Sequence, residues 1–187
     1  ECKVLNSSDY LVPQIRRRVV FIGSKISKNI LFPSKHTKGK VNIKDAIGDL
    51  PKLKSGQKSK IKNHAAMNHS EQMLKKMSFV KDGCGRETIP KKIRPKSGDV
   101  RKYIRYDSSK PSICITGDMR KVFHYSQNRA LTVRELARIQ TFSDSFIFKG
   151  STISQQQQIG NAVPPLMARA IARTLKSMMN NVFKKAS

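Results

Sequence analysis

The segment LVPQIRRRVVFIG, residues 11–23, decides the fold class expected for this chain. Its apolar residues Val19, Val20, Phe21 and Ile22 form one short continuous run that ends at Gly23. Such a run is typical of a strand that is buried on both faces, as in a parallel sheet. We therefore expect a buried strand here, and three arginines at its entrance need a partner.

Side chains alternate along an extended strand. Gln14, Arg16 and Arg18 then point to one side of the strand, and Arg17 points to the other. The sequence thus predicts that a glutamine and two guanidinium groups converge on one site.

The charge of the whole chain indicates what these arginines face. It holds 38 Lys and Arg against 12 Asp and Glu, a formal net charge of +26. Basic side chains displace the counterions that condense on phosphate backbones, so nucleic acid is the favoured partner. A membrane surface or an acidic protein would also fit the charge alone.

The apolar runs and the cysteines indicate in which cellular environment the chain folds. No apolar run approaches the roughly 20 residues of a membrane span, and the first residues lack the apolar core of a signal peptide. The three cysteines, Cys2, Cys84 and Cys114, are odd in number and scattered. We therefore expect no membrane segment, and the cysteines suggest a reducing cytosol and not a disulfide scaffold.

The middle of the chain, from about residue 25 to 105, is rich in Lys, Ser, Gly and Pro and has poor periodicity. Residues 41–51 predict a short helix, and residues 70–79 predict another with Ser70 as its cap. Residues 110–116 predict a strand. This pattern indicates a small, irregular α+β domain.

Regular patterning returns at RALTVRELARIQTF, residues 129–142. Thr132 followed by Glu135 is a capping box, in which each side chain satisfies the other residue's free backbone N–H. Leu136 and Ile139 then share one face of the helix.

The last patterned segment is IGNAVPPLMARAIARTLKSMM, residues 159–179. It starts with a Gly-Asn turn, and its two prolines suit the first turn of a helix. One helix face is apolar, with Leu166, Ala170, Ile171, Leu175 and Met178, and the opposite face carries Arg169, Arg173 and Lys176.

These segments, in this order, resemble the C-terminal part of the DNA cytosine-5 methyltransferases. PQIRRR is similar to the eighth motif of that family through Gln14, Arg16 and Arg18. RALTVRELARIQTFSDSF is similar to the ninth, and QIGNAVPPLMARAIA to the tenth. The resemblance implies an α/β fold, the C-terminal portion of a Rossmann-like S-adenosylmethionine-dependent methyltransferase, with a small irregular α+β target-recognition domain.

The resemblance also implies roles for individual residues. The target cytosine of double-stranded DNA is flipped into the catalytic pocket, where Arg18 contacts it and Arg16 supports that contact. Asn161 and Ala162 approach the cofactor, S-adenosylmethionine. In the ninth motif, Arg134, Glu135 and Arg138 are expected to be structural, with Glu135 and Arg138 paired.

Gln14 and three arginines of the variable region, Arg101, Arg105 and Arg120, are our candidates for DNA contacts, because Arg to guanine is the commonest specific pair. No metal site is expected. His64, His69 and Cys84 do not have the spacing of a standard zinc site.

The expected layout has four parts. Residues 1–24 belong to the catalytic domain, and residues 25–146 form the recognition domain together with the ninth motif. Residues 147–158 form a hinge, and residues 159–187 return as a helix that packs on the catalytic domain.

Important parts of the family pattern are missing from this sequence. It contains no Gly-rich cofactor motif, no Pro-Cys nucleophile and no Glu-Asn-Val motif. We therefore expect that the chain cannot methylate DNA alone, and that its partner is an N-terminal half or a separate subunit with motifs one to seven. A split enzyme of a restriction–modification system and a fragment of a single-chain enzyme both fit.

Two other interpretations stay open on the sequence alone. The chain could be a basic, non-catalytic nucleic-acid-binding module, which would need neither a partner subunit nor a cofactor. It could also be a degenerate remnant without activity.

Overall fold

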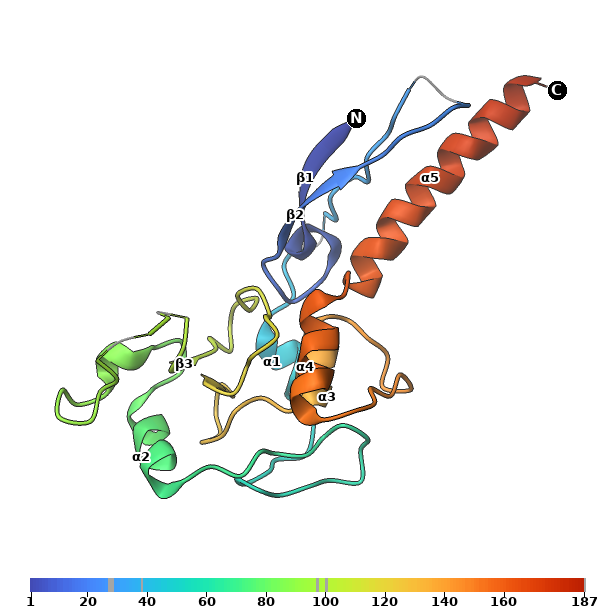
Figure 1. Cartoon of the computed structure of the whole chain (residues 1–187). Coiled ribbons are helices and arrows are strands. Elements are labelled where there is room, and N and C mark those ends of the chain that lie inside the picture. Colours follow the sequence, from blue (N-terminus) through green and yellow to red (C-terminus); the bar gives the residue numbers. More distant parts are fainter. Residues whose placement is uncertain (27–28, 38, 97, 100, 187) are drawn as a thin grey trace.

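Figure 1 shows the computed structural model, which describes residues 1–26, 29–37, 39–96, 98–99 and 101–186, with side chains as far as residue 180. One part of the molecule is a two-stranded ribbon beside a long helix. The other part is formed by short helices and extended segments. The chain crosses from the first part to the second after the ribbon and returns through the long helix.

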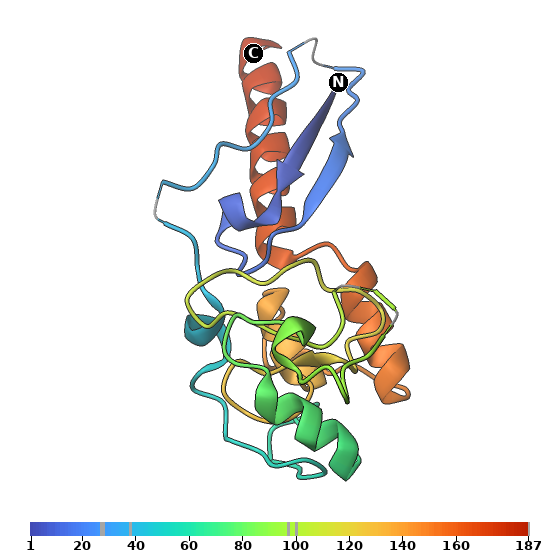
Figure 2. The same ribbon diagram turned by 90° about the vertical axis from the view of Figure 1, so that its left-hand side faces the viewer.

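The ribbon consists of β1 (Cys2–Asn6) and β2 (Arg17–Phe21), which pair antiparallel. A 3-10 turn, η1 (Ser7–Tyr10), follows β1, and the 22-residue helix α5 (Pro165–Ala186) runs alongside the ribbon (Figures 1 and 2). The core between them holds Leu5, Tyr10, Val12 and Met167. The predicted amphipathic helix is confirmed, because Met178 is buried and the residues on its charged face are exposed.

The predicted strand is present as β2, but its pairing and its burial differ from the prediction. β2 lies in an antiparallel pair, not in a parallel sheet, and Val19 and Phe21 are 54% and 78% exposed. An apolar run can be buried only where another layer covers it. Within the described chain, α5 lies along one side of the ribbon, and the opposite face, which includes Val4, is left uncovered.

The second part contains four α-helices and a minimal parallel strand pair within the described residues. Its elements are α1 (Ile43–Ile47), α2 (Glu71–Phe79), η2 (Arg86–Thr88), β3 (Ile104–Arg105), β4 (Val122–Phe123), α3 (Val133–Ile139) and α4 (Thr152–Asn161). Its main core is formed by buried residues of α1, α3 and α4 and of the segments between them, among them Ile43, Ile47, Leu131, Leu136, Ile139 and Ile159.

Two predicted helix caps are confirmed: Ser70 caps α2 by accepting the Met73 N–H, and Thr132 caps α3. The short helix expected within residues 41–51 is present as α1, which Asn42 caps. At α3 the capping box with Glu135 is complete in both directions. Leu136 and Ile139 are both fully buried, as their spacing predicted.

Other local predictions were wrong. Residues 110–116 form no strand and pair only through an isolated bridge between Ser112 and Gln14, although Ile113 and Ile115 alternate between exposed and buried. The Gly-Asn pair of the tenth motif is the last turn of α4, not a free turn. This helix begins at Thr152, so most of the segment expected as a hinge is helical.

Candidate functional site

Arg16 joins the eighth motif to the tenth motif and to the 114–115 segment. Its side chain is only 4% exposed, although it carries a charge. The guanidinium donates to the carbonyl oxygen of Gly160 at 2.8 Å, to that of Ile115 at 3.3 Å, and to Cys114 Sγ at 3.2 Å. Burial of a charged group is costly unless acceptors surround it, and here they come from two distant segments.

The environment of Arg16 changes its ionisation. Desolvation lowers the pKa of Arg16 from its ordinary value, and the nearby Arg18 cation lowers it further, while Cys114 opposes both effects. An arginine has a wide margin above neutral pH, so the group stays charged and donates to all of these acceptors.

Gln14 belongs to the same network. Its Nε2 donates to Gln140 Oε1 at 3.0 Å, and its Oε1 accepts the Ile115 N–H at 3.1 Å. Gln140 in turn donates to the carbonyl oxygen of Ile159 at 2.7 Å. The prediction that Gln14 contacts DNA was wrong, because this side chain is fully buried and its amide groups are occupied.

Arg16, the 114–117 segment and the end of α4 meet at one place, which we call the junction. Close backbone contact there requires glycine at position 160. A Cβ atom there would lie 2.8 Å from the carbonyl carbon of Thr116 and 3.0 Å from the N of Gly117. Real Cβ atoms do not approach backbone so closely, so the end of α4 can reach the 114–117 segment only with glycine at this position.

Arg18 reaches out from the junction. Like Arg16, it approaches Cys114 Sγ, here at 3.8 Å, so the two side chains lie on the same side of the strand as predicted. Arg18 is exposed, and its Nη1 donates to the Arg17 carbonyl oxygen at 2.7 Å. The structure therefore brings together one buried and one exposed guanidinium, and of these two only Arg18 is accessible to a substrate.

The three arginines of the variable region have different environments. Arg101 and Arg120 are exposed, and each is paired with a carboxylate two residues earlier, Asp99 or Asp118. Either side chain can reach a ligand in solution. The two aspartates were not predicted as partners, although the spacing Asp-x-Arg occurs at both places.

Arg105 was predicted to contact DNA, and this prediction was wrong. Its side chain is 6% exposed and donates to the carbonyl oxygens of Met77 and Val80 and to Asn128 Oδ1, among other acceptors. A long side chain that crosses from β3 to α2 can satisfy several orphan carbonyls at once, and Arg105 serves the core of this part of the molecule.

The ninth motif contains a buried ion pair, but not the predicted one. Glu135 accepts two hydrogen bonds from Arg129, at 2.6 and 2.8 Å, and both side chains are buried. Arg138 lies at the surface, where it pairs with Asp49 and Asp144. The capping box turns the Glu135 carboxylate back toward the start of α3, away from Arg138.

The other charged residue of this motif, Arg134, is also fully buried. It donates to the backbone carbonyl oxygens of Lys62, Ser143 and Phe146 at 2.8–3.1 Å. It therefore ties α3 to the segments on either side, which agrees with a structural role.

His124 lies beside the buried pair, with its Nε2 3.7 Å from Glu135 Oε1. Burial lowers the pKa of His124 to about 4, Glu135 opposes this shift, and the cations of Arg129 and Arg105 add to it. Its Nδ1 accepts the Ser126 N–H, a bond that only the unprotonated nitrogen can make. This histidine is a neutral structural group.

The end of α4 presents the two residues predicted to approach the cofactor. Asn161 is exposed, and Ala162 is half-buried and caps the helix through its N–H. The next residue, Val163, is 60% exposed. An amide side chain and an exposed apolar side chain thus lie within one turn of the Gly160 carbonyl that Arg16 binds.

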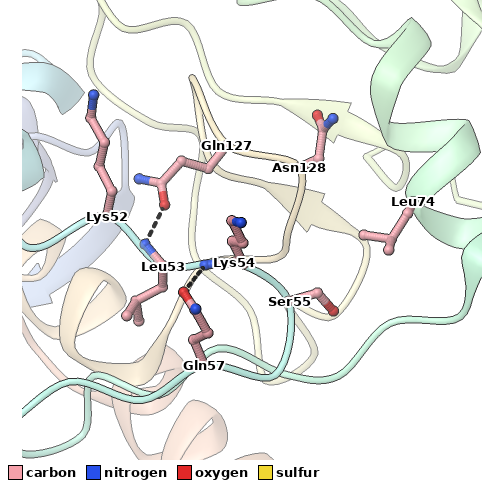
Figure 3. A pocket seen from close by; sticks show the side chains of 8 residues that line it. All are labelled: Lys52, Leu53, Lys54, Ser55, Gln57, Leu74, Gln127 and Asn128. Atoms are coloured by element: carbon pink, nitrogen blue, oxygen red, sulfur yellow. Dashed lines mark hydrogen bonds between the residues drawn. The ribbon is translucent and has the colours of Figure 1, made fainter.

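An open groove lies in another region, between α2 and the 52–57 segment (Figure 3). Its volume is about 660 Å³, and its lining residues are Lys52, Leu53, Lys54, Ser55, Gln57, Leu74, Gln127 and Asn128. The Gln127 side-chain oxygen accepts the Leu53 N–H at 2.9 Å. None of the predicted site residues lines this groove, and we assign it no function.

Metal ligands are not gathered anywhere in the described residues. They contain no group of three or more His, Cys, Asp or Glu side chains arranged to hold a metal ion, and His64 and His69 instead bond Thr132 and the Ala130 N–H. Likewise, no helix in the described ranges has the length and apolar content needed to cross a bilayer.

Two type II methyltransferases match this chain in sequence over nearly its whole length. It is 61% identical over 181 residues to the type II methyltransferase M1.HphI of Haemophilus parahaemolyticus, a match that covers 97% of this chain and 49% of the relative. It is 31% identical to the type II methyltransferase M.DdeI of Desulfomicrobium norvegicum, over 96% of this chain and 54% of the relative. The chain thus spans about half the length of these relatives.

A solved structure has the same fold. It is a putative DNA modification methyltransferase encoded within a prophage of E. coli, with a TM-score of 0.70 and 19% sequence identity, over 96% of this chain and 60% of that one. The fold is therefore the α/β fold of a DNA methyltransferase. The model of the C-5 cytosine-specific DNA methylase family matches residues 1–177, and this chain belongs to that family.

Proposed function

We propose that this chain supplies the target-recognition region and the last three motifs of a DNA cytosine-5 methyltransferase of a restriction–modification system. A segment that carries the nucleophilic cysteine, on the same polypeptide or on a separate subunit, completes the enzyme. Without that segment the chain does not methylate DNA, because its residues include no Pro-Cys nucleophile.

The observation that carries this proposal is the uncovered apolar face of the β1–β2 ribbon. Val4, Val19 and Phe21 are 58%, 54% and 78% exposed on neighbouring strands. Large apolar side chains grouped on one face of a sheet mark a surface that another element covers. The remaining strands and helices of the methylase fold are the natural cover.

The proposed domain layout is the one expected from the sequence. Residues 1–24 join the catalytic domain, and residues 159–187 return to pack on it. Residues 25–146 form the recognition domain, and residues 147–158 connect it to the returning helix. The Arg16 junction lies where these parts meet.

Catalysis needs the target cytosine outside the stacked duplex, because the reactive carbon is inaccessible inside it. Arg18 extends from the junction and donates to the flipped base or its phosphate. Its planar, permanently charged fork suits both acceptors. Arg16 and Gln14 touch no substrate in this scheme and position β2 against the end of α4.

S-adenosylmethionine supplies the methyl group when it is bound. The exposed Asn161 amide and the apolar Val163 fit one edge of a site for a molecule with an amino-acid part and a purine part. Ala162 contributes backbone to the same edge, and the other edge belongs to the segment that completes the enzyme.

Co-purification tests the proposal. This chain is expressed with the part of M1.HphI that it does not match, and the mixture is assayed for association and for base preference on duplex DNA. We expect association and sequence-dependent binding, and Phe21→Glu should abolish association. Phe79→Glu, at a 37% exposed position on α2, is the matched control and should associate normally.

Two results would count against the proposal. One is association that Phe21→Glu leaves unchanged. The other is a complex that binds every duplex equally and loses affinity steeply with salt, as a plain basic module does.

A further inference from the structure

A short repeat occurs twice in the recognition domain. The sequence Gly-Asp-x-Arg-Lys is found at residues 98–102 and again at residues 117–121. The two copies precede β3 and β4, which pair in parallel. Because the two strands run parallel, the repeat places its two arginines, Arg101 and Arg120, at the same end of the strand pair, just before each strand begins.

Each aspartate of the repeat holds its arginine in the same way. Asp99 Oδ1 accepts the backbone N–H of Arg101 at 2.9 Å and its Nε at 3.0 Å, while Oδ2 accepts Nη2 at 2.8 Å. Asp118 Oδ1 accepts the backbone N–H of Arg120 at 3.1 Å and its Nε at 2.9 Å, while Oδ2 accepts Nη2 at 3.4 Å.

This arrangement occupies one edge of each guanidinium and leaves the other open. The carboxylate takes the Nε–Nη2 edge, and within the described chain Nη1 of neither arginine has a hydrogen-bond partner. The side chains of Arg101 and Arg120 are 63% and 51% exposed. Each arginine is thus fixed in direction and presents two parallel N–H groups outward.

The two copies are also joined to each other. The Tyr103 N–H donates to the Lys121 carbonyl oxygen at 2.7 Å, and Lys102 Nζ lies 3.4 Å from Asp118 Oδ2. Lys121 Nζ lies over the Tyr103 ring, 5.2 Å from its centroid. The arginines are therefore carried by one braced unit and do not move independently on separate loops.

We propose that Arg101 and Arg120 each read one guanine in the major groove, oriented by Asp99 and Asp118. This inference rests on the function proposed above and deepens it by naming the bases and the reading residues. Guanine presents two acceptors, O6 and N7, that match the free Nη1–Nη2 edge of an arginine.

The carboxylates favour a base over a phosphate as the ligand. An aspartate beside a phosphate would repel it, and a phosphate contact needs no fixed side-chain direction. A base edge carries no net charge and demands a defined angle, so an orienting carboxylate is useful there. The hydrogen bond from Arg101 lowers the pKa of Asp99 to about 2, and Arg120 lowers the pKa of Asp118 still further, so both carboxylates are ionised at neutral pH.

The test uses the enzyme complete with its nucleophile-bearing part and a pool of duplexes with randomised bases. The methylated duplexes are sequenced for the original chain and for Arg101→Ala and Arg120→Ala. Each substitution should relax the preference for guanine at one position, and the two positions should differ. The expected loss of discrimination is roughly 5- to 150-fold at that position.

Three further variants separate base reading from a general effect of positive charge. Asp99→Asn and Asp118→Asn keep the size of the side chain but weaken its hold on the arginine, so discrimination should fall while overall affinity does not. Lys92→Ala removes an exposed positive charge in the same domain and should weaken binding equally for all sequences.

Retention of the original base preferences by Arg101→Ala and Arg120→Ala would overturn this inference and leave the proposed function standing. An original enzyme without any base preference would overturn both.

Discussion

Arg16 donates a hydrogen bond to the carbonyl oxygen of Gly160 at 2.8 Å, across 144 positions of sequence. The two residues belong to the eighth and tenth motifs, and the bond joins the entrance of β2 to the last turn of α4. The 114–116 segment lies between them, since Arg16 also binds Cys114 and Ile115. Arg16 is thus the residue on which the relative placement of three segments depends.

Gly160→Ala should destabilise this junction. The new methyl group would collide with the backbone of Thr116 and Gly117, and backbone cannot move aside as a flexible side chain can. We expect a loss of about 1–3 kcal/mol in the free energy of unfolding, measured by urea denaturation. Gly23→Ala is the control, because a Cβ atom there meets nothing within 4 Å. Equal stability of the two variants would show that the junction does not require glycine.

Arg18→Ala should separate catalysis from DNA binding. The exposed guanidinium is proposed to contact the flipped cytosine, so its loss should slow methyl transfer by the complete enzyme roughly 100-fold or more. Affinity for the duplex should change little. Arg173→Ala, at an exposed position on the charged face of α5, is the control and should transfer methyl groups at nearly the original rate. A defect in DNA binding alone for Arg18→Ala would argue against contact with the flipped base.

Glu135→Ala should reduce stability and not the chemistry. It would leave the guanidinium of Arg129 buried without its carboxylate and would remove the capping box of α3. The expected cost is about 3–5 kcal/mol in urea unfolding. Glu71→Ala, at an exposed position in the first turn of α2, should be almost neutral. Normal melting of Glu135→Ala together with lost methyl transfer would show that Glu135 acts in catalysis instead.

Stability should fall in mild acid because of His124. Its pKa is lowered by burial to about 4 in the folded chain, whereas the unfolded side chain titrates near 6.5. Between these values the unfolded state binds more protons, so the free energy of unfolding decreases as the pH falls. The full effect is roughly 3 kcal/mol, and Glu135, whose pKa is also lowered in the fold, adds to acid instability at lower pH.

Urea unfolding at several pH values between about 7.5 and 4.5 measures this dependence. His124→Gln should make the curve shallower in this range, and His69, whose pKa is also lowered by burial and by Arg129, should account for part of the slope that remains. A wild-type curve that is already flat would mean that His124 is protonated in the folded chain.

The helix positions were predictable from the sequence because their signals are local. Ser70 and the Thr132–Glu135 box define helix starts through contacts three residues apart, and Pro165 begins α5. Burial of β2 was not predictable, since it depends on a covering layer that no local pattern specifies.

The side-chain partners that are distant in sequence could not be predicted either. The spacing that suggested a pair between Glu135 and Arg138 is an ordinary helical one, but the capping box directs the carboxylate to Arg129. Likewise Arg105 and Arg120 look alike in the sequence, and only the packing of α2 against β3 makes one of them a core residue. The repeat around Arg101 and Arg120, in contrast, was visible in the sequence itself.

The central claim is that this chain recognises DNA but needs another segment for chemistry. The most direct test is transfer of tritium from labelled S-adenosylmethionine to mixed-sequence duplex DNA. The assay compares this chain alone, the part of M1.HphI that it does not match alone, and the two together. We expect methyl transfer only when both are present, and methyl transfer by this chain alone would contradict the claim.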